Sequence, residues 1–163
     1  MWWSDARLPR RALLAGAAVA LAGCGFTPAY APGSTGSALR GQVSVTTPSS
    51  TLGFRLKGRI EERLGRSEGT GRYRLDITLD VTEEGVAVTP EGAVTRFTFT
   101  AIARFSLIDR DTGETLVTGT VDNFTSYSTT DSTVATQTAR DDAQARLARL
   151  LGDQLLTRLL AAG

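Results

Sequence analysis

Residues 96–108 read RFTFTAIARFSLI and alternate between two kinds of side chain. One set is apolar throughout: Phe97, Phe99, Ala101, Ala103, Phe105 and Leu107. The other set is mostly polar: Thr98, Thr100, Ile102, Arg104 and Ser106. Because successive side chains of a β-strand point to opposite faces, this period of two predicts a strand with one face in a core and one toward solvent.

Three further segments predict strands of the same sheet. Residues 73–82 (YRLDITLDVT) alternate in the same way, and residues 42–46 (QVSVT) form a shorter first strand. Residues 115–127 predict the last strand, with a bulge near Gly119, where the apolar spacing breaks. Residues 83–95 predict a turn region, in which Val86 and Val88 offer an extension of the preceding strand.

Two segments predict amphipathic helices. In residues 52–64 the apolar side chains recur every fourth position, and Gly65 follows as a stop. After Ser132, a suitable N-cap, residues 133–160 carry a broad apolar face made of Ala139, Ala143, Leu147, Leu150, Leu151, Leu155 and Leu159. The expected fold is therefore α+β: a four-stranded, mostly antiparallel sheet with two helices packed on one face, in the order βαβββα.

The start of the chain predicts an export signal. Arg7, Arg10 and Arg11 precede an apolar run from Ala12 to Ala22, which at about 11 residues is shorter than the roughly 20 that a membrane-spanning helix needs. The run ends in Leu21-Ala22-Gly23-Cys24, which resembles the lipobox of bacterial lipoproteins. A plain secretory signal is the alternative. The Arg10-Arg11 pair fits a twin-arginine signal poorly, so we expect Sec export.

The lipobox resemblance divides the chain into three parts. It implies that residues 1–23 are a signal peptide and that lipid is attached to Cys24, the only cysteine, anchoring the protein to a membrane. Residues 24–41, rich in glycine, proline and hydroxyl residues, are expected to be a flexible tether. Residues 42–163 are expected to form a single domain. Gly25, rather than aspartate, follows Cys24, and the resemblance then implies sorting to the outer membrane.

The composition argues against catalysis and against nucleic-acid binding. Residues 1–23 hold three of the 18 basic and one of the 17 acidic residues, so the remaining chain has a net charge of −1. The chain has no histidine. This excludes histidine as a general base and excludes the metal sites that use histidine ligands. Adjacent carboxylates such as Glu61-Glu62 do not face each other across a cleft. We expect a non-catalytic protein without a cofactor or metal.

Several segments in order along the chain resemble the LptE family of outer-membrane lipoproteins that assemble lipopolysaccharide, in its alphaproteobacterial form. These segments are Cys24 to Tyr30 (CGFTPAY), Gly85 to Thr89, Thr95 to Phe97, Ala101 to Phe105, Phe124 to Tyr127, Ser132 to Thr136 and Ala139 to Ala143. The similarity covers nearly the whole chain, while no single motif decides it.

The resemblance implies a function and two partners. LptE-like proteins sit inside the large β-barrel LptD, support its assembly, and bind the lipopolysaccharide that the pair places in the outer leaflet. For the acidic groups of that ligand we expect contact with Arg96, and with Arg72, Arg74 and Arg104 nearby, because guanidinium groups bind phosphate and carboxylate in bidentate fashion. The alternative is a periplasm-facing accessory lipoprotein or lipid carrier without a barrel partner.

Overall fold

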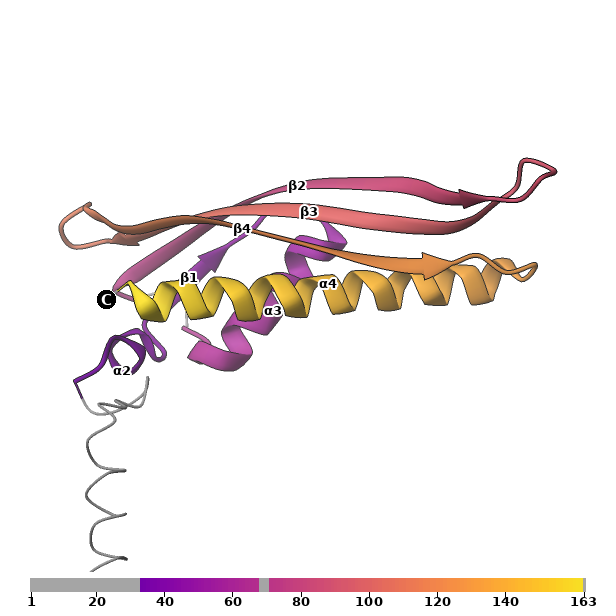
Figure 1. Ribbon diagram of the computed structural model, residues 1–163. Coiled ribbons are helices and arrows are strands. Elements are labelled where there is room, and N and C mark those ends of the chain that lie inside the picture. Colours follow the sequence, from indigo (N-terminus) through magenta and orange to yellow (C-terminus); the bar gives the residue numbers. More distant parts are fainter. Residues whose placement is uncertain (1–32, 68–70, 163) are drawn as a thin grey trace, which may run out of the picture.

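The computed structural model describes residues 33–67 and 71–162, in which a long, narrow sheet lies on a layer of helices (Figure 1). The sheet consists of β1 (Val43–Thr46), β2 (Tyr73–Val88), β3 (Val94–Asp109) and β4 (Thr115–Ser128), in the order β1-β2-β3-β4. β1 is parallel to β2, and the other two pairs are antiparallel. The predicted four-stranded, mostly antiparallel sheet is confirmed.

The two predicted helices cover the same face of this sheet. α3 (Thr51–Leu64) and α4 (Thr133–Ala161) pack against each other, and α4 runs along β4 for most of the length of the sheet (Figure 1). Ser50 caps α3, since its side chain accepts a hydrogen bond from the Gly53 N–H at 3.1 Å. Gly65 ends the helix with a φ of 83°, a conformation that glycine adopts at little cost.

The core lies between the sheet and the helices, where the alternation of the strands placed it. Phe99, Ala101, Ala103, Phe105 and Leu107 of β3 are all buried. They pack with the apolar stripes of the helices, whose most deeply buried members are Leu56, Ile60, Leu64, Leu147, Leu151, Leu155 and Leu159. The opposite face of the sheet carries no helix in the described part of the chain and is rich in threonine. We call it the open face.

The last residues of the segment expected to be a flexible tether are folded. Residues Thr35–Leu39 form a short helix, α2, and Leu39 is only 2 % exposed. The Gly41 N–H also donates a hydrogen bond to the Leu64 carbonyl at 2.7 Å. The expectation of an unpacked tether is therefore wrong for residues 34–41, because Leu39 supplies apolar surface that the core can bury. The expected signal peptide and Cys24 lie outside the described residues.

Three local expectations about the sheet and α4 are also corrected. Gly119 is not at a bulge: it pairs in register with Phe105, and a Cβ atom there would approach Phe105 Cζ to 2.5 Å. The register shift between β3 and β4 lies instead at Leu107 and Ile108. The turn between β2 and β3 is shorter than residues 83–95, because the extension through Val88 pairs with β3. Leu150, expected in the core, is 44 % exposed.

Membrane insertion by a helix has no candidate among the described residues. No helix in residues 33–67 and 71–162 combines the length and the apolar character that a bilayer span requires.

Candidate functional site

The four arginines expected to bind an acidic ligand are spread along the sheet rather than gathered. Arg74 pairs with Ile108 at one end of the β2–β3 ladder, Arg104 pairs with Thr78 further along, and Arg96 pairs with Ala87 at the other end. At about 3.3 Å per residue, Arg74 and Arg96 are roughly 40 Å apart. We call the end with the β2–β3 turn and the β4–α4 connection distal, and the other end proximal (Figure 1).

The two proximal arginines are held by carboxylates. Arg72 donates from Nε and Nη2 to Asp109 Oδ2, at 3.1 and 2.8 Å, and its guanidinium lies 5.3 Å from the centre of the Tyr73 ring. These hydrogen bonds from Arg72, with a further one from the Asp111 N–H, lower the pKa of the Asp109 carboxyl. Arg74 donates to Asp76 at 2.9 Å. Both cations are therefore already neutralised by neighbouring acids.

Arg104 lies on the open face, midway along the sheet. It borders a shallow hollow of about 410 Å³ together with Asp76, Thr78 and Ser106. No carboxylate within the described residues lies at ion-pair distance from it. Arg104 is thus available to an anion, although Asp76 on the same face weakens the local positive potential.

Arg96 shares a distal hollow with a second arginine that the sequence did not single out. This distal basic hollow, of about 420 Å³, is lined by Arg96, Ser126, Tyr127, Ser128, Ala139, Asp142 and Arg146. Arg146 pairs with Asp142 and donates from Nη2 to the Ser126 carbonyl at 3.2 Å, while no carboxylate in the described part of the chain pairs with Arg96. Two guanidinium groups against one carboxylate leave the hollow with a net positive charge.

The distal basic hollow can therefore bind a small anionic group. Guanidinium donors suit phosphate or carboxylate oxygens, and the hydroxyls of Ser126 and Ser128 add neutral donors. One signal for Arg146 is visible in the sequence, namely its position four residues after Asp142 on the predicted helix. That spacing predicts an ion pair along the helix but not the strand against which it lies.

Glu83 of β2 holds the distal end together. Its carboxylate accepts two hydrogen bonds from Arg140 of α4, at 3.0 and 2.6 Å, and one from the Tyr127 hydroxyl of β4 at 2.6 Å. The bonds from Arg140, more than that from Tyr127, lower the pKa of Glu83. Burial raises the pKa of Tyr127, and its bond to Glu83 raises it further. We call Glu83, Tyr127 and Arg140 the distal triad.

Aromatic rings support the distal triad from the core side. Tyr127 stacks on Phe97 and Phe99, with ring centres 5.5 and 5.7 Å apart, and the guanidinium of Arg140 lies 5.4 Å from the centre of Phe99. Because Tyr127 also lines the distal basic hollow, the triad and the rings fix one wall of that hollow.

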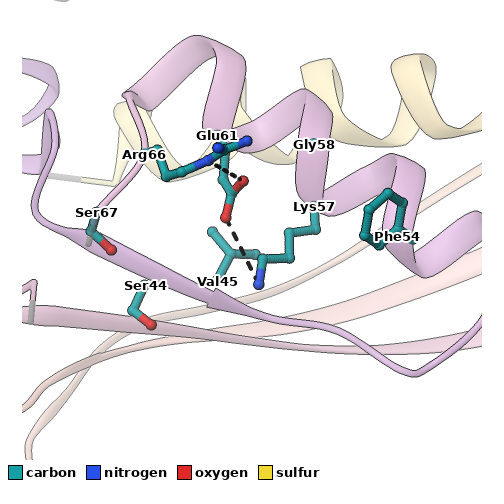
Figure 2. A pocket seen from close by; sticks show the side chains of 8 residues that line it. All are labelled: Ser44, Val45, Phe54, Lys57, Gly58, Glu61, Arg66 and Ser67. Carbon is teal, nitrogen blue, oxygen red and sulfur yellow. Dashed lines mark hydrogen bonds and ion pairs between the residues drawn. The ribbon is translucent and has the colours of Figure 1, made fainter. Parts of the chain in front are cut away.

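A third hollow, at β1 and α3, has a different character. It is about 500 Å³ in volume, and Figure 2 shows Lys57 and Arg66 converging on Glu61 beside Val45. The two cations lie 3.8 and 3.3 Å from the Glu61 carboxylate. Both charges are thus engaged, and the exposed ring of Phe54 at the edge is the main apolar feature.

The fold is shared with bacterial lipoproteins of known structure. A lipoprotein from Caulobacter crescentus CB15 is 22 % identical, with a TM-score of 0.64 over 77 % of this chain and 92 % of its own. The rare lipoprotein B from Shewanella oneidensis is 11 % identical, with a TM-score of 0.55 over 74 % of this chain and 94 % of its own. Lipoprotein B from Nitrosomonas europaea is 15 % identical, with a TM-score of 0.53 over 73 % and 81 %.

Sequence comparison identifies the family. No curated protein matches the chain significantly. The family model described as "LptE: Lipopolysaccharide-assembly" matches residues 40–159, which span β1 to nearly the end of α4. The match confirms the resemblance drawn from the sequence, and the chain belongs to the LptE lipopolysaccharide-assembly family.

Proposed function

We propose that this protein is a non-catalytic outer-membrane lipoprotein that plugs an LptD-like β-barrel, supports its assembly, and takes part in delivering lipopolysaccharide to the outer leaflet. The observation that carries the proposal is the family match over residues 40–159, because it covers the whole sheet, α3 and nearly all of α4. The lipobox-like run from Leu21 to Cys24 supports a lipid anchor on the N-terminal side of this domain.

The surface of the domain supports a barrel partner. The open face presents hydroxyls from all three long strands, those of Thr78, Thr82, Thr98, Thr100 and Thr120. Thr82 lies opposite Thr100, and Thr78 and Thr120 lie on either side of Arg104. The interior of a large outer-membrane barrel is polar and wet, so a hydroxyl-rich, narrow sheet is compatible with that environment.

Contact with lipopolysaccharide is assigned within this proposal chiefly to Arg96. Arg96 lies in the distal basic hollow with Arg146, and Arg104 is the second candidate because it too has no paired carboxylate among the described residues. Arg72 and Arg74 are weaker candidates, since Asp109 and Asp76 already accept their hydrogen bonds.

Association with the barrel is tested by purification of tagged full-length protein from its own cell envelope in mild detergent. We expect an LptD-like barrel to co-purify in a fixed ratio to the tagged protein, and an untagged strain serves as the control. Recovery of the lipoprotein without a barrel would favour the accessory-lipoprotein alternative.

A further inference from the structure

The outer margin of β2 has no neighbouring strand over most of its length. β1 pairs only with residues Tyr73 to Asp76, after which the chain turns at Thr47 and Pro48 and enters α3. Proline cannot donate to a ladder, so β1 stops there. From Ile77 onward, β2 forms the margin of the sheet within the described residues (Figure 1).

The hydrogen bonds at the start of β2 show which backbone groups point outward. The Tyr73 N–H donates to the Gln42 carbonyl, on the β1 side, at 2.9 Å, and the Arg72 carbonyl accepts from the Arg110 N–H, on the β3 side, at 2.9 Å. Since backbone groups alternate in direction along a strand, the odd-numbered residues face outward. Leu79, Val81 and Glu83 therefore direct their N–H and C=O groups toward the free margin.

This margin is regular enough to accept another strand. Ile77 to Glu84 pair with β3 without any shift in register, and the irregularity begins only after Gly85. Short strands and bulges are common means by which proteins block pairing at an edge. Neither protects the segment Ile77 to Glu84.

The side chains at this margin select the kind of strand that fits. Asp80 and Glu84 lie on the open face, whereas Leu79 and Val81 lie on the helix face, where Val81 is 44 % exposed. The segment has no basic residue. Pairing with a second copy would line up acidic side chains along one seam, which is unfavourable. A strand with basic side chains beside Asp80 and Glu84 would be favoured instead.

We propose that residues Ile77 to Glu84 of β2 form a docking edge for an extended segment of another protein, which adds to the sheet as a strand. The docking segment of the other protein has alternating side chains. Its basic side chains lie on the open face, and its apolar side chains lie on the helix face, where they cover Leu79 and Val81. The backbone groups provide affinity, and the alternation provides specificity. This inference stands independently of the barrel and of lipopolysaccharide.

The test uses the full-length lipoprotein in detergent and hydrogen exchange measured at single amides. The probe is a blocked peptide of about seven residues, a typical strand length, in which valine and lysine alternate. We expect about tenfold slower exchange at the outward amides of Leu79, Val81 and Glu83 when the peptide is mostly bound. The amides of Thr78, Asp80 and Thr82 should not change, because they already face β3. A peptide of alternating valine and glutamate is the control.

Two pairs of variants separate the backbone from the charge. Val81→Pro removes one outward N–H without touching the β3 ladder and should abolish the protection, whereas Val81→Thr keeps the N–H and should retain it. Asp80→Lys should also abolish the protection. Asp122→Lys is its matched control, because Asp122 lies on the open face in the same cross-strand row but on β4.

Three results would overturn the proposal. The first is unchanged exchange at the outward amides with millimolar lysine peptide. The second is equal protection by both peptides, which would remove the charge selection. The third is protection that rises with protein concentration without any peptide, which would indicate pairing with a second copy.

Discussion

At the scale of single residues, Glu83 determines how the distal half of β2 is held. Its carboxylate joins Arg140 of α4 and Tyr127 of β4, so three elements meet at one side chain. Further toward the turn, β2 has no helix against it, and Val86 and Val88 are exposed. The distal triad is therefore the last firm attachment of the β2–β3 hairpin to the helix layer.

The contribution of Glu83 to stability should depend on pH. Because Arg140 lowers the pKa of Glu83 in the folded state, the stabilisation is fully present above the unfolded pKa of about 4.3 and is lost as the pH falls through the folded value. Glu83→Gln should lower the free energy of unfolding at pH 7 by about 1 kcal/mol, a modest value because the site is partly solvated.

Urea unfolding at pH 7 and pH 3 measures this effect. The difference between wild type and Glu83→Gln should be smaller at pH 3 than at pH 7, because pH 3 lies below the unfolded pKa of Glu83 and the stabilisation falls from there toward the lowered folded pKa. Glu84→Gln, at the exposed neighbouring position, should change little at either pH. An equal loss for the two variants at pH 7 would contradict the role given to the distal triad.

Replacing two glycines by alanine should change the stability of the protein in opposite directions. A Cβ at Gly119 would meet the ring of Phe105 at 2.5 Å, so Gly119→Ala should cost about 1–3 kcal/mol of stability through overpacking. Gly58, an exposed helix position with nothing within 4 Å of its Cβ direction, should gain up to about 1 kcal/mol as alanine. Thermal unfolding of both variants shows whether each one is more or less stable than wild type. Stabilisation by Gly119→Ala would contradict the observed packing.

Replacing Arg96 or Arg146 should weaken binding of an acidic ligand with only a small loss of stability, because the ion pair of Arg146 with Asp142 is solvent-exposed. Replacing either by alanine removes charge-assisted hydrogen bonds and should weaken lipopolysaccharide binding about tenfold, while Arg149→Ala on the exposed side of α4 serves as control. Binding of purified lipopolysaccharide to the full-length protein measures the effect. Equal affinities of all three variants would remove the distal basic hollow as the contact.

At the scale of elements, the apolar patterns decide what the sequence can predict. The alternation of Phe97 to Leu107 and the four-residue spacing from Leu52 to Leu64 each indicate a face that must be buried, so the strand and the helix that contain them are predicted with nearly the right bounds. The helix cap Ser132 could be predicted because its chemistry is local: its hydroxyl accepts a hydrogen bond from the Ala135 N–H.

Features that depend on distant partners could not be predicted in this way. The sequence around Leu39 resembles a linker, and only the core that receives Leu39 makes α2 a packed element. Gly119 looks like a bulge until Phe105 is known to lie against it. In the same way, Arg146 and Arg140 are ordinary polar positions of a helix until β3, β4 and Glu83 are placed beside them.

The contact between α3 and α4 can be tested directly by mutation. Leu56 is fully buried, and its Cδ1 would lie 3.4 Å from a Cβ at Gly152, so the two helices approach closely there. Leu56→Ala should cost about 2–5 kcal/mol. Phe54→Ala, on the same helix but at a side chain 79 % exposed, should cost far less, and similar losses in denaturant unfolding would contradict the assignment of faces.

At the scale of the whole molecule, the chain combines a predicted lipid anchor, a narrow polar-faced sheet and one long helix. The proximal end carries neutralised arginines and the short β1, whereas the distal end carries the distal basic hollow and the distal triad. The docking edge of β2 lies between them along one margin. The proposed contacts with an acidic glycolipid and with a protein strand therefore use different parts of the sheet.

The central claim is the role in lipopolysaccharide assembly, and depletion of the protein in its own cell tests it most directly. Folded LptD-like barrel and surface lipopolysaccharide are measured together as the protein is withdrawn. The account predicts loss of both, with recovery when the wild-type chain is restored. Normal amounts of folded barrel and of surface lipopolysaccharide after complete depletion would contradict it.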